Sequence, residues 1–220
     1  MEEECPICKS NSLDDDLRQY GVFRCLYCKH FFRLPRTFDY SYYKDNNYWI
    51  KDDEYLSRIQ KMFFSFFEDD IYLNENSSSI EVGAADGHFL SYLNAKQKHN
   101  IYYNELEDLL STKYDFVKRK YICPAEDINN DFDNVFMIDV IEHFKNVYFI
   151  NKLLKKRGKL YIATDSAMSI SAEVLMIHHP EHFNIFSQKS LEILANKLNL
   201  KVNLYYDAKI IDKTFAILEK

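Results

Sequence analysis

The stretch that decides the fold of this chain runs from residue 80 to residue 90 and reads Ile80-Glu81-Val82-Gly83-Ala84-Ala85-Asp86-Gly87-His88-Phe89-Leu90. A short apolar run carrying one acid ends in a glycine, a second glycine follows, and an apolar helical pattern comes next. This order predicts a strand, a tight turn and a helix. The chain has only four glycines, two of them in this turn. Glycine serves where backbone turns sharply or approaches a ligand closely, so we expect a ligand against residues 83–87.

Two well-known glycine-rich patterns do not fit this turn. A phosphate-binding P-loop needs Lys and Ser or Thr after its last glycine, whereas His88 and Phe89 follow Gly87. The dinucleotide pattern needs a middle glycine, and Ala85 stands there. What remains is acid-x-Gly-x-Ala-x-Gly at the end of a strand, or else an ordinary strand-to-helix turn with no ligand.

This remaining pattern resembles the first motif of the class I S-adenosylmethionine-dependent methyltransferases. The resemblance implies that Glu81 faces the amino group of the cofactor's methionine part and that Gly83 lets the backbone approach it. Ala85 replaces the commoner middle glycine and adds only a methyl group.

The segments that follow come in the order of that family. Residues 101–105 form an apolar run that ends in Glu105, at the distance where cofactor-binding α/β folds place an acid on the ribose. Asn104 and Glu107 are alternatives for this role. Glu105 could instead be an exposed acid that caps a helix over residues 107–118.

Three further segments extend the resemblance over residues 76–220. Residues 123–128 resemble the loop beside the adenine, and residues 132–144 resemble the fourth strand with the loop after it. Residues 153–164 predict a helix end, a turn with Gly158 at the position after the helix, and a fifth strand. The expected cofactor-binding residues are Glu81, Gly83, Ala85, Gly87, Glu105, Glu126, Asp127 and Asp139. The implied fold is α/β, a seven-stranded, mostly parallel Rossmann-like sheet that ends in an antiparallel strand near residues 213–219.

Four cysteines stand near the start of the chain. Cys5 and Cys8 form one Cys-x2-Cys pair, and Cys25 and Cys28 form a second. This spacing is typical of a tetrahedral four-cysteine zinc site, which leaves no open position for catalysis. A pair of disulfides is the alternative. The sequence predicts structural zinc, whose binding would help so short a segment to fold.

Composition and charge bound the remaining organisation. We expect a zinc ribbon over residues 1–35, a helical and Tyr-rich connecting or lid segment over 36–75, and a methyltransferase domain over 76–220. In the middle segment, Tyr42, Tyr43 or Tyr48 could close over the active site or pack between domains. The net charge of −6 speaks against nucleic acid as the partner. Without a long apolar run or a signal peptide, the chain is expected to be cytoplasmic.

Two histidine groups are candidates for the general base that a hydroxyl or acidic C–H acceptor needs. His143 follows Glu142, whose carboxylate could orient the imidazole, although this pair could merely shape the cofactor loop. His182 lies in the stretch 178–187, before a helix over 188–199 that Ser187 is expected to cap. A metal site there is disfavoured, because Pro180 interrupts any helix that would align the histidines.

The zinc ribbon, the Tyr-rich segment and the two histidine groups together are similar to methyltransferases of sugar and surface-polysaccharide pathways. The predicted activity is therefore methyl transfer to a small molecule such as a sugar derivative. One alternative is a methyltransferase of RNA or protein that binds its substrate through the ribbon. The other is a non-catalytic scaffold that binds the cofactor, against which the acids Glu81, Glu105 and Asp139 argue.

Overall fold

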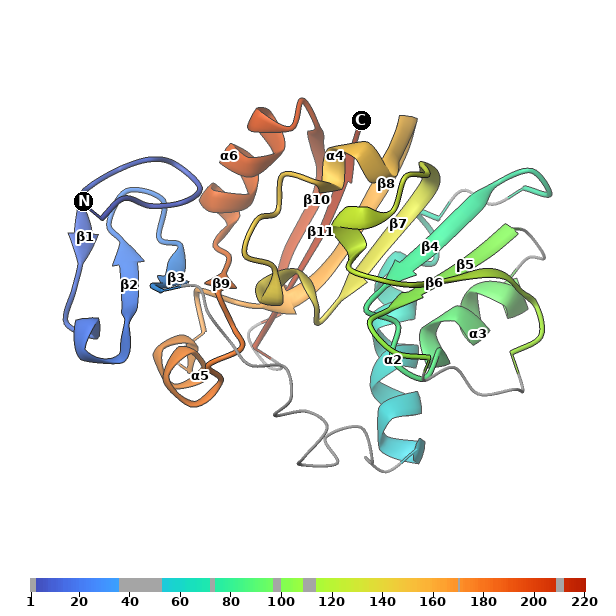
Figure 1. Ribbon diagram of the computed structural model, residues 1–220, viewed down its shortest axis with the longest axis horizontal. Helices are drawn as coiled ribbons and strands as arrows, with labels where there is room; N and C mark the ends of the chain where they lie inside the picture. Colours follow the sequence, from blue (N-terminus) through green and yellow to red (C-terminus); the bar gives the residue numbers. More distant parts are fainter. Residues whose placement is uncertain are drawn as a thin grey trace. The chain divides into compact units, whose positions relative to one another are not determined.

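A computed structural model describes residues 3–35, 53–71, 74–96, 100–108, 114–169, 171–208 and 212–220. Two sheets organise these residues (Figure 1). One has seven strands in the order β10-β11-β8-β7-β4-β5-β6, and the other has four in the order β1-β2-β3-β9. The predicted α/β fold with a seven-stranded sheet is confirmed.

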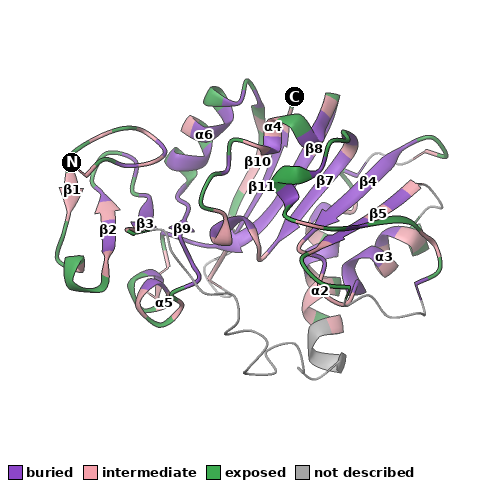
Figure 2. Cartoon of the chain, in the orientation of Figure 1, coloured by how far each residue is buried: buried purple, intermediate pink, exposed green. Residues whose placement is uncertain are grey.

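The strands of the larger sheet are β4 (Ser78–Val82), β5 (Asn100–Glu105), β6 (Val117–Ile122), β7 (Phe132–Ile138), β8 (Leu154–Asp165), β10 (Lys201–Ala208) and β11 (Lys213–Glu219). β4 pairs in parallel with both β5 and β7, and β5 pairs in parallel with β6. β10 and β11 pair antiparallel, as expected for the last strand. All five residues of β4 are buried, which fits a strand covered on both faces (Figure 2).

The longer helices are α2 (Asp53–Phe67), α3 (His88–Lys96), α5 (Ala172–His178) and α6 (Gln188–Lys197). A short helix α4 (Ile150–Leu153) and the 3-10 turns η1 (Arg18–Tyr20), η2 (Ala125–Asp127) and η3 (Ile141–His143) complete the described set. α6 begins as expected, because the Ser187 side chain accepts from the Ser190 amide and the Ser190 side chain accepts from the Ser187 amide.

The four-stranded sheet joins the N-terminal segment to a distant part of the chain. Its strands are β1 (Leu13–Asp14), β2 (Val22–Cys25), β3 (Phe31–Arg33) and β9 (Asn184–Ile185). Phe31 pairs with Ile185 and Phe32 with Asn184. The ribbon predicted over residues 1–35 is therefore completed by a strand from the stretch that carries His182.

The chain folds as two compact units. One contains residues 1–38, 139–148 and 162–219, and the other contains residues 39–138, 149–161 and Lys220. In the second unit, aromatic rings fill the core: Phe136 stacks on Tyr161 with ring centres 4.6 Å apart, and Phe89 lies 5.0 Å from Phe136. In the first unit, Val22, Phe31, Met176 and Ile185 are buried together.

Two local predictions are wrong. Gly158 does not follow a helix but lies inside β8, which begins at Leu154. A Cβ there would lie 2.9 Å from the carbonyl oxygens of Lys155 and Phe132, so close backbone packing is what requires glycine. The helix expected over 107–118 is also wrong where the structure describes it, because Val117 and Lys118 belong to β6.

Other predictions fall partly outside the described residues. Tyr42, Tyr43 and Tyr48 all lie in a range that the structure does not describe, so the lid stays a prediction. Among the described residues, none of the helices has the length and apolar composition needed to cross a membrane.

Candidate functional site

The turn between β4 and α3 has the backbone geometry that its glycines suggest. Gly83 and Gly87 have φ angles of 66° and 86°, in the left-handed region that favours glycine. Ala85 also has a positive φ, 46°, at the position where the commoner pattern has glycine. The Tyr103 hydroxyl donates to the Ala85 carbonyl at 2.8 Å, which holds the turn in this strained form.

A buried carboxylate, one oxygen of which has no hydrogen-bond partner among the described residues, stands at the carboxyl end of β4. Glu81 is 2 % exposed, and its Oε2 finds no hydrogen-bond partner among the described residues. Burial raises the pKa of Glu81 well above its usual range, and the carboxylates of Asp86 and Glu105 add to the rise. A bound cation would relieve this cost, so the site suits a positively charged group such as the amino group of S-adenosylmethionine.

Glu105 ends the neighbouring strand β5 and points its carboxylate at the turn. Its Oε2 accepts from the Ala85 amide at 3.2 Å, and its Oε1 accepts from the Leu106 amide at 2.8 Å. The two alternatives are placed differently. Asn104 donates its amide to the carbonyls of Tyr121 and Cys123, both at 2.9 Å, and Glu107 is exposed. Of these three candidates, Glu105 is the one whose carboxylate accepts a hydrogen bond from the turn.

The remaining cofactor candidates lie in two places. Glu126 and Asp127 are exposed in η2, which follows β6. Asp139 directly follows β7 along the chain, has a φ of 51°, and accepts from Lys213 Nζ at 2.7 Å. Sequence analysis did not assign a role to this lysine, nor to His88, whose Nε2 lies 3.1 Å from Asp86 Oδ2 beside the turn.

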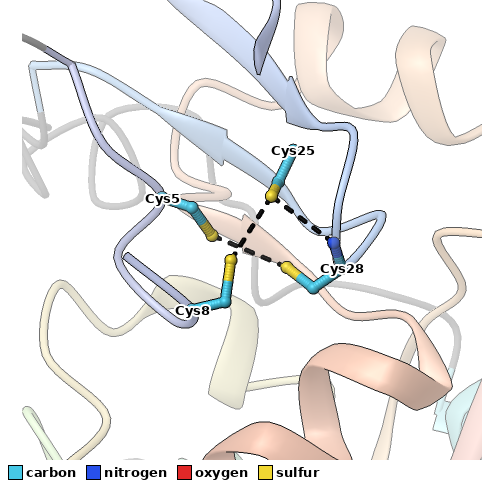
Figure 3. Close-up of side chains that lie close together, drawn as sticks. All are labelled: Cys5, Cys8, Cys25 and Cys28. Carbon is cyan, nitrogen blue, oxygen red and sulfur yellow. Dashed lines mark hydrogen bonds between the residues drawn. The ribbon is translucent and has the colours of Figure 1, made fainter. Parts of the chain in front are cut away.

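The four cysteines form one cluster, called the cysteine cluster below (Figure 3). Cys5 Sγ lies 3.6 Å from Cys28 Sγ, and Cys8 Sγ lies 3.4 Å from Cys25 Sγ. All four are free thiols rather than disulfides. Thiolates bound to one tetrahedral zinc ion at about 2.3 Å lie about 3.8 Å apart, so these cysteines are positioned to bind a metal ion and fit structural zinc.

Both halves of the cysteine cluster use the same backbone turn. The Lys9 amide donates to the Cys5 carbonyl at 2.9 Å, and the Lys29 amide donates to the Cys25 carbonyl at 2.8 Å. Both lysines have positive φ angles, 66° and 59°. The sequence repeat is thus also a structural repeat. His30, a possible further ligand, instead bonds Asn184 Oδ1 through Nε2 at 3.2 Å.

A second polar group, called the histidine cluster below, consists of His143, His179, Glu181 and His182. The ring centre of His182 lies 4.8 Å from that of His143 and 5.0 Å from that of His179. The structure thus brings together the two predicted base candidates. It adds His179 and Glu181, which sequence reasoning did not single out.

One hydrogen bond, from His143, and one close contact with a carboxylate, from His182, orient the rings of this cluster. His143 Nδ1 lies 3.3 Å from the Glu181 carbonyl oxygen, which can only accept. In the neutral ring the proton is therefore on Nδ1 and the basic lone pair is on Nε2. His182 Nδ1 lies 3.3 Å from Asp165 Oδ2, and Lys213 Nζ holds the other oxygen of Asp165 at 2.7 Å.

The electrostatics of this region favour neutral histidines. Burial lowers the pKa of His143, and burial together with the neighbouring His143 and His179 lowers that of His182 to about 2. Burial and the carboxylates of Asp139 and Asp165 raise the pKa of Glu142 to about 8. Its Oε2 accepts from the Thr164 hydroxyl at 2.8 Å. Neutral imidazoles are the form that accepts a proton or binds a metal ion.

The ribbon holds the chain on both sides of His182. The Arg33 side chain on β3 donates to the carbonyls of Tyr20, His182 and Met176, and its amide donates to the Phe183 carbonyl at 3.2 Å. Further along, the Ser187 hydroxyl donates to the Cys28 carbonyl. The stretch with His182 is thus anchored to residues near the cysteine cluster.

Comparisons with known proteins agree on the fold. A model of the protein family described as "Methyltransferase domain" matches residues 48–204. A search of curated protein sequences found no match.

Several solved structures share the architecture at low sequence identity. A chain from the complex between the Haloferax volcanii Trm112 methyltransferase activator and a methyltransferase has a TM-score of 0.67 and 10% identity, covering 82% of this chain and 97% of that one. An S-adenosylmethionine-dependent methyltransferase of Archaeoglobus fulgidus has a TM-score of 0.59 and 11% identity, and the match covers 83% of this chain and 100% of that one. The 1,6-didemethyltoxoflavin-N1-methyltransferase of Burkholderia thailandensis, solved with S-adenosylhomocysteine, has a TM-score of 0.57 and 14% identity, and the match covers 82% of this chain and 84% of that one.

Proposed function

The chain belongs to the methyltransferase-domain family of S-adenosylmethionine-dependent enzymes, and from that premise we propose that its acceptor is a small molecule, a sugar or a precursor of a surface polysaccharide, methylated in the cytoplasm. Bound S-adenosylmethionine supplies an electrophilic methyl group on a sulfonium. The protein's tasks are to hold the cofactor, to position the acceptor and to remove the acceptor's proton.

The observation that carries the cofactor part of the proposal is the buried Oε2 of Glu81, which has no hydrogen-bond partner in the described part of the chain. In the proposal, Glu81 accepts from the cofactor's amino group and Glu105 accepts from its ribose. Gly83, Ala85 and Gly87 form the turn that lets backbone approach the cofactor. Glu126, Asp127 and Asp139 contribute further contacts.

We propose that His143 Nε2 is the general base that removes the acceptor's proton. The hydrogen bond from Nδ1 to the Glu181 carbonyl supports this assignment, because it fixes the tautomer whose lone pair is on Nε2. A bound cofactor would supply the methyl group to the acceptor oxygen, and the imidazole of His143 would take up the proton that this oxygen gives up, so that charge and atoms balance. His182, paired with Asp165, is the second candidate base, and Glu142 shapes the electrostatics around both.

Calorimetry with S-adenosylhomocysteine tests the cofactor part. Glu81→Gln should weaken binding by about 1.5–3 kcal/mol, because it removes the negative charge opposite the amino group. Glu105→Ala should weaken binding by about 1–3 kcal/mol, because it removes the acceptor for the ribose. A Glu107→Ala variant, which changes a neighbouring exposed acid, should bind as the wild type does. If Glu105→Ala binds normally and Glu107→Ala does not, the ribose role belongs to Glu107.

The raised pKa of Glu81 predicts a pH dependence for the same binding reaction. A cationic amino group needs the ionised carboxylate, so affinity should fall as the pH falls through the raised pKa of Glu81. Wild-type binding should release protons, seen as a heat that depends on the ionisation enthalpy of the buffer. In Glu81→Gln this release should disappear, and a release that persists there would assign it to another group.

A methyl-transfer screen against sugar nucleotides tests the acceptor. A macromolecular acceptor is the second candidate, and it is favoured by the exposure of Leu26 (45%) and Tyr27 (56%) between two cysteines of the ribbon. Transfer of labelled methyl groups to proteins or RNA of a cell lysate, with no transfer to any sugar, would support that candidate instead.

A further inference from the structure

The short segment His179-Pro180-Glu181-His182 brings two imidazoles and a carboxylate to one place. One ligand atom from each of His179, Glu181 and His182 lies within 4.8 Å of the others. Glu181 is 3% exposed and His182 is 8% exposed, so both are withdrawn from water. The side chains of His179 and Glu181 have no part in the base proposed above, for which His182 is only the second candidate.

The distances in this segment match those of ligands around a single ion. The ring centres of His179 and His182 are 5.0 Å apart. Two imidazoles bound to one tetrahedral ion through nitrogens at about 2.0–2.1 Å have ring centres about 5 Å apart. His179 Nδ1 already lies 3.1 Å from Glu181 Oε1. Small side-chain rotations would therefore let an ion replace this hydrogen bond.

A buried carboxylate behind His182 supplies the usual outer partner of a metal-binding histidine. His182 Nδ1 lies 3.3 Å from Asp165 Oδ2, yet it has no aligned hydrogen bond among the described residues. Metal-bound histidines generally donate their other ring N–H to a carboxylate, which fixes the tautomer and the ring orientation. Lys213 holds Asp165 in place at 2.7 Å, leaving His182 Nε2 for the ion.

We propose that His179, Glu181 and His182 bind one divalent transition-metal ion, in addition to the ion of the cysteine cluster. Two histidines and one carboxylate leave coordination positions open, in contrast to four thiolates. Those positions suit an acceptor with two neighbouring oxygen atoms, such as the vicinal hydroxyls of a sugar; this last step rests on the proposed function. His143 stays outside the coordination shell and keeps its role as base.

A second group of side chains competes for the same ion. Glu142, His143 and His182 also offer ligand atoms within 4.8 Å of one another. Glu142 is the weaker ligand, because its pKa of about 8 keeps it protonated near neutral pH and its Oε2 already accepts from Thr164. The two sets share only His182, so single substitutions separate them.

The test is a titration of the metal-free full chain with Co²⁺, followed by visible spectroscopy and metal counting. The wild type should bind two ions, one with thiolate-to-cobalt charge-transfer bands and one with only weak nitrogen- and oxygen-type bands. Glu181→Gln and His182→Ala should weaken the second ion more than about 100-fold, and Asp165→Asn about 10–100-fold. His178→Ala, which changes an exposed histidine next to the site, and Glu142→Gln should both keep two ions.

The thiolate bands report in every variant whether the ribbon is folded, so a misfolded variant is recognised. One ion in a wild type with intact thiolate bands would overturn the proposal. So would a second ion that survives Glu181→Gln and is lost in Glu142→Gln. If only the metal proposal is wrong, S-adenosylhomocysteine still binds and the acceptor screen still gives a product. If the proposed function is wrong, S-adenosylhomocysteine does not bind or no sugar is methylated.

Discussion

The cysteine cluster and the histidine cluster are both groups of metal-binding side chain types, but they are built in opposite ways. Each half of the cysteine cluster comes from one local turn, and the two turns repeat the same hydrogen bond and the same positive φ. The histidine cluster joins His143 to a segment nearly forty residues later, and its rings are oriented by Glu181 and Asp165. A closed shell of four thiolates suits structure, whereas neutral imidazoles with an open side suit chemistry.

The largest effect should come from removing the metal ion of the cysteine cluster. Structural zinc contributes about 10–16 kcal/mol to the folding of small zinc-binding peptides, so chelation should unfold the ribbon. Because β3 pairs with β9 and Arg33 binds the His182 carbonyl, the histidine cluster should also lose order. Histidine ring signals in nuclear magnetic resonance spectra should shift or broaden, while S-adenosylhomocysteine affinity stays near that of the untreated protein. Unchanged histidine signals would mean that the two clusters are independent.

Loss of the proposed base should come next. His143→Ala should lower turnover about 10²–10⁴-fold, with S-adenosylhomocysteine affinity near wild type, because a general base acts on the acceptor and not on the cofactor. The matched variant is His178→Ala, which should turn over normally. If His143→Ala is nearly as active as wild type and His182→Ala is inactive, the base is His182.

Arg33 joins the ribbon to the stretch with His182, and changing it should have a smaller effect than removing the metal ion or the proposed base. Arg33→Lys leaves a charge but cannot reach all three carbonyls that the guanidinium binds, so it should cost about 1–3 kcal/mol of unfolding free energy. Urea unfolding measures the cost. Arg24→Lys, a change of the same kind on β2, serves as the control and should cost less. Equal costs would show that Arg33 does not anchor the stretch with His182.

The raised pKa of Glu142 predicts that the free energy of unfolding depends on pH. Its folded-state pKa is about 8 and its ordinary value is 4.5, so between these values the folded state holds a proton that the unfolded state has lost. Stability should therefore fall as the pH rises from about 4.5 to about 8. Burial is the main cause of the raised pKa; the carboxylates of Asp139 and Asp165 add to it, and Lys213 opposes it. Glu142→Gln should flatten the thermal-unfolding profile over this range; a wild-type profile that is already flat would contradict the assignment.

The smallest effect should come from the helix cap next to the ribbon. Ser187→Ala removes both the cap of α6 and the bond to the Cys28 carbonyl, and should cost about 0.5–2 kcal/mol. Ser190→Ala loses the reciprocal half of the capping box and a bond to the Ser187 carbonyl, both local to the helix start, and should cost less. A larger cost for Ser190→Ala would assign the stabilisation to the box and not to the bond with the ribbon.

What could be predicted from sequence follows the same division between local and long-range structure. The cysteine spacing, the Ser187 cap and the β4 turn are local patterns, and the structure confirms them. Gly158 was misread because it lies inside β8, where one of the two carbonyl oxygens that require glycine belongs to Phe132 on another strand. Lys213 and Asp165 carry no local signal, since only the pairing of distant segments brings them beside the histidines. Glu181 is the sequence neighbour of His182, but only the fold brings its carbonyl oxygen to His143. Because Pro180 cannot lie inside a regular helix, the sequence analysis disfavoured a metal site there. The three side chains proposed as ligands, those of His179, Glu181 and His182, lie instead in an irregular turn.

The pairing of β3 with β9 also has a consequence for synthesis of the chain. The four cysteines leave the ribosome well before β9, so their metal ion can be bound while β9 is still unmade. His30 and its partner Asn184 are 154 residues apart, and the edge of β3 must wait for β9 to be translated. Until then the exposed strand edge is a place where a nascent chain could pair with a neighbour. Its short length of three residues limits that hazard.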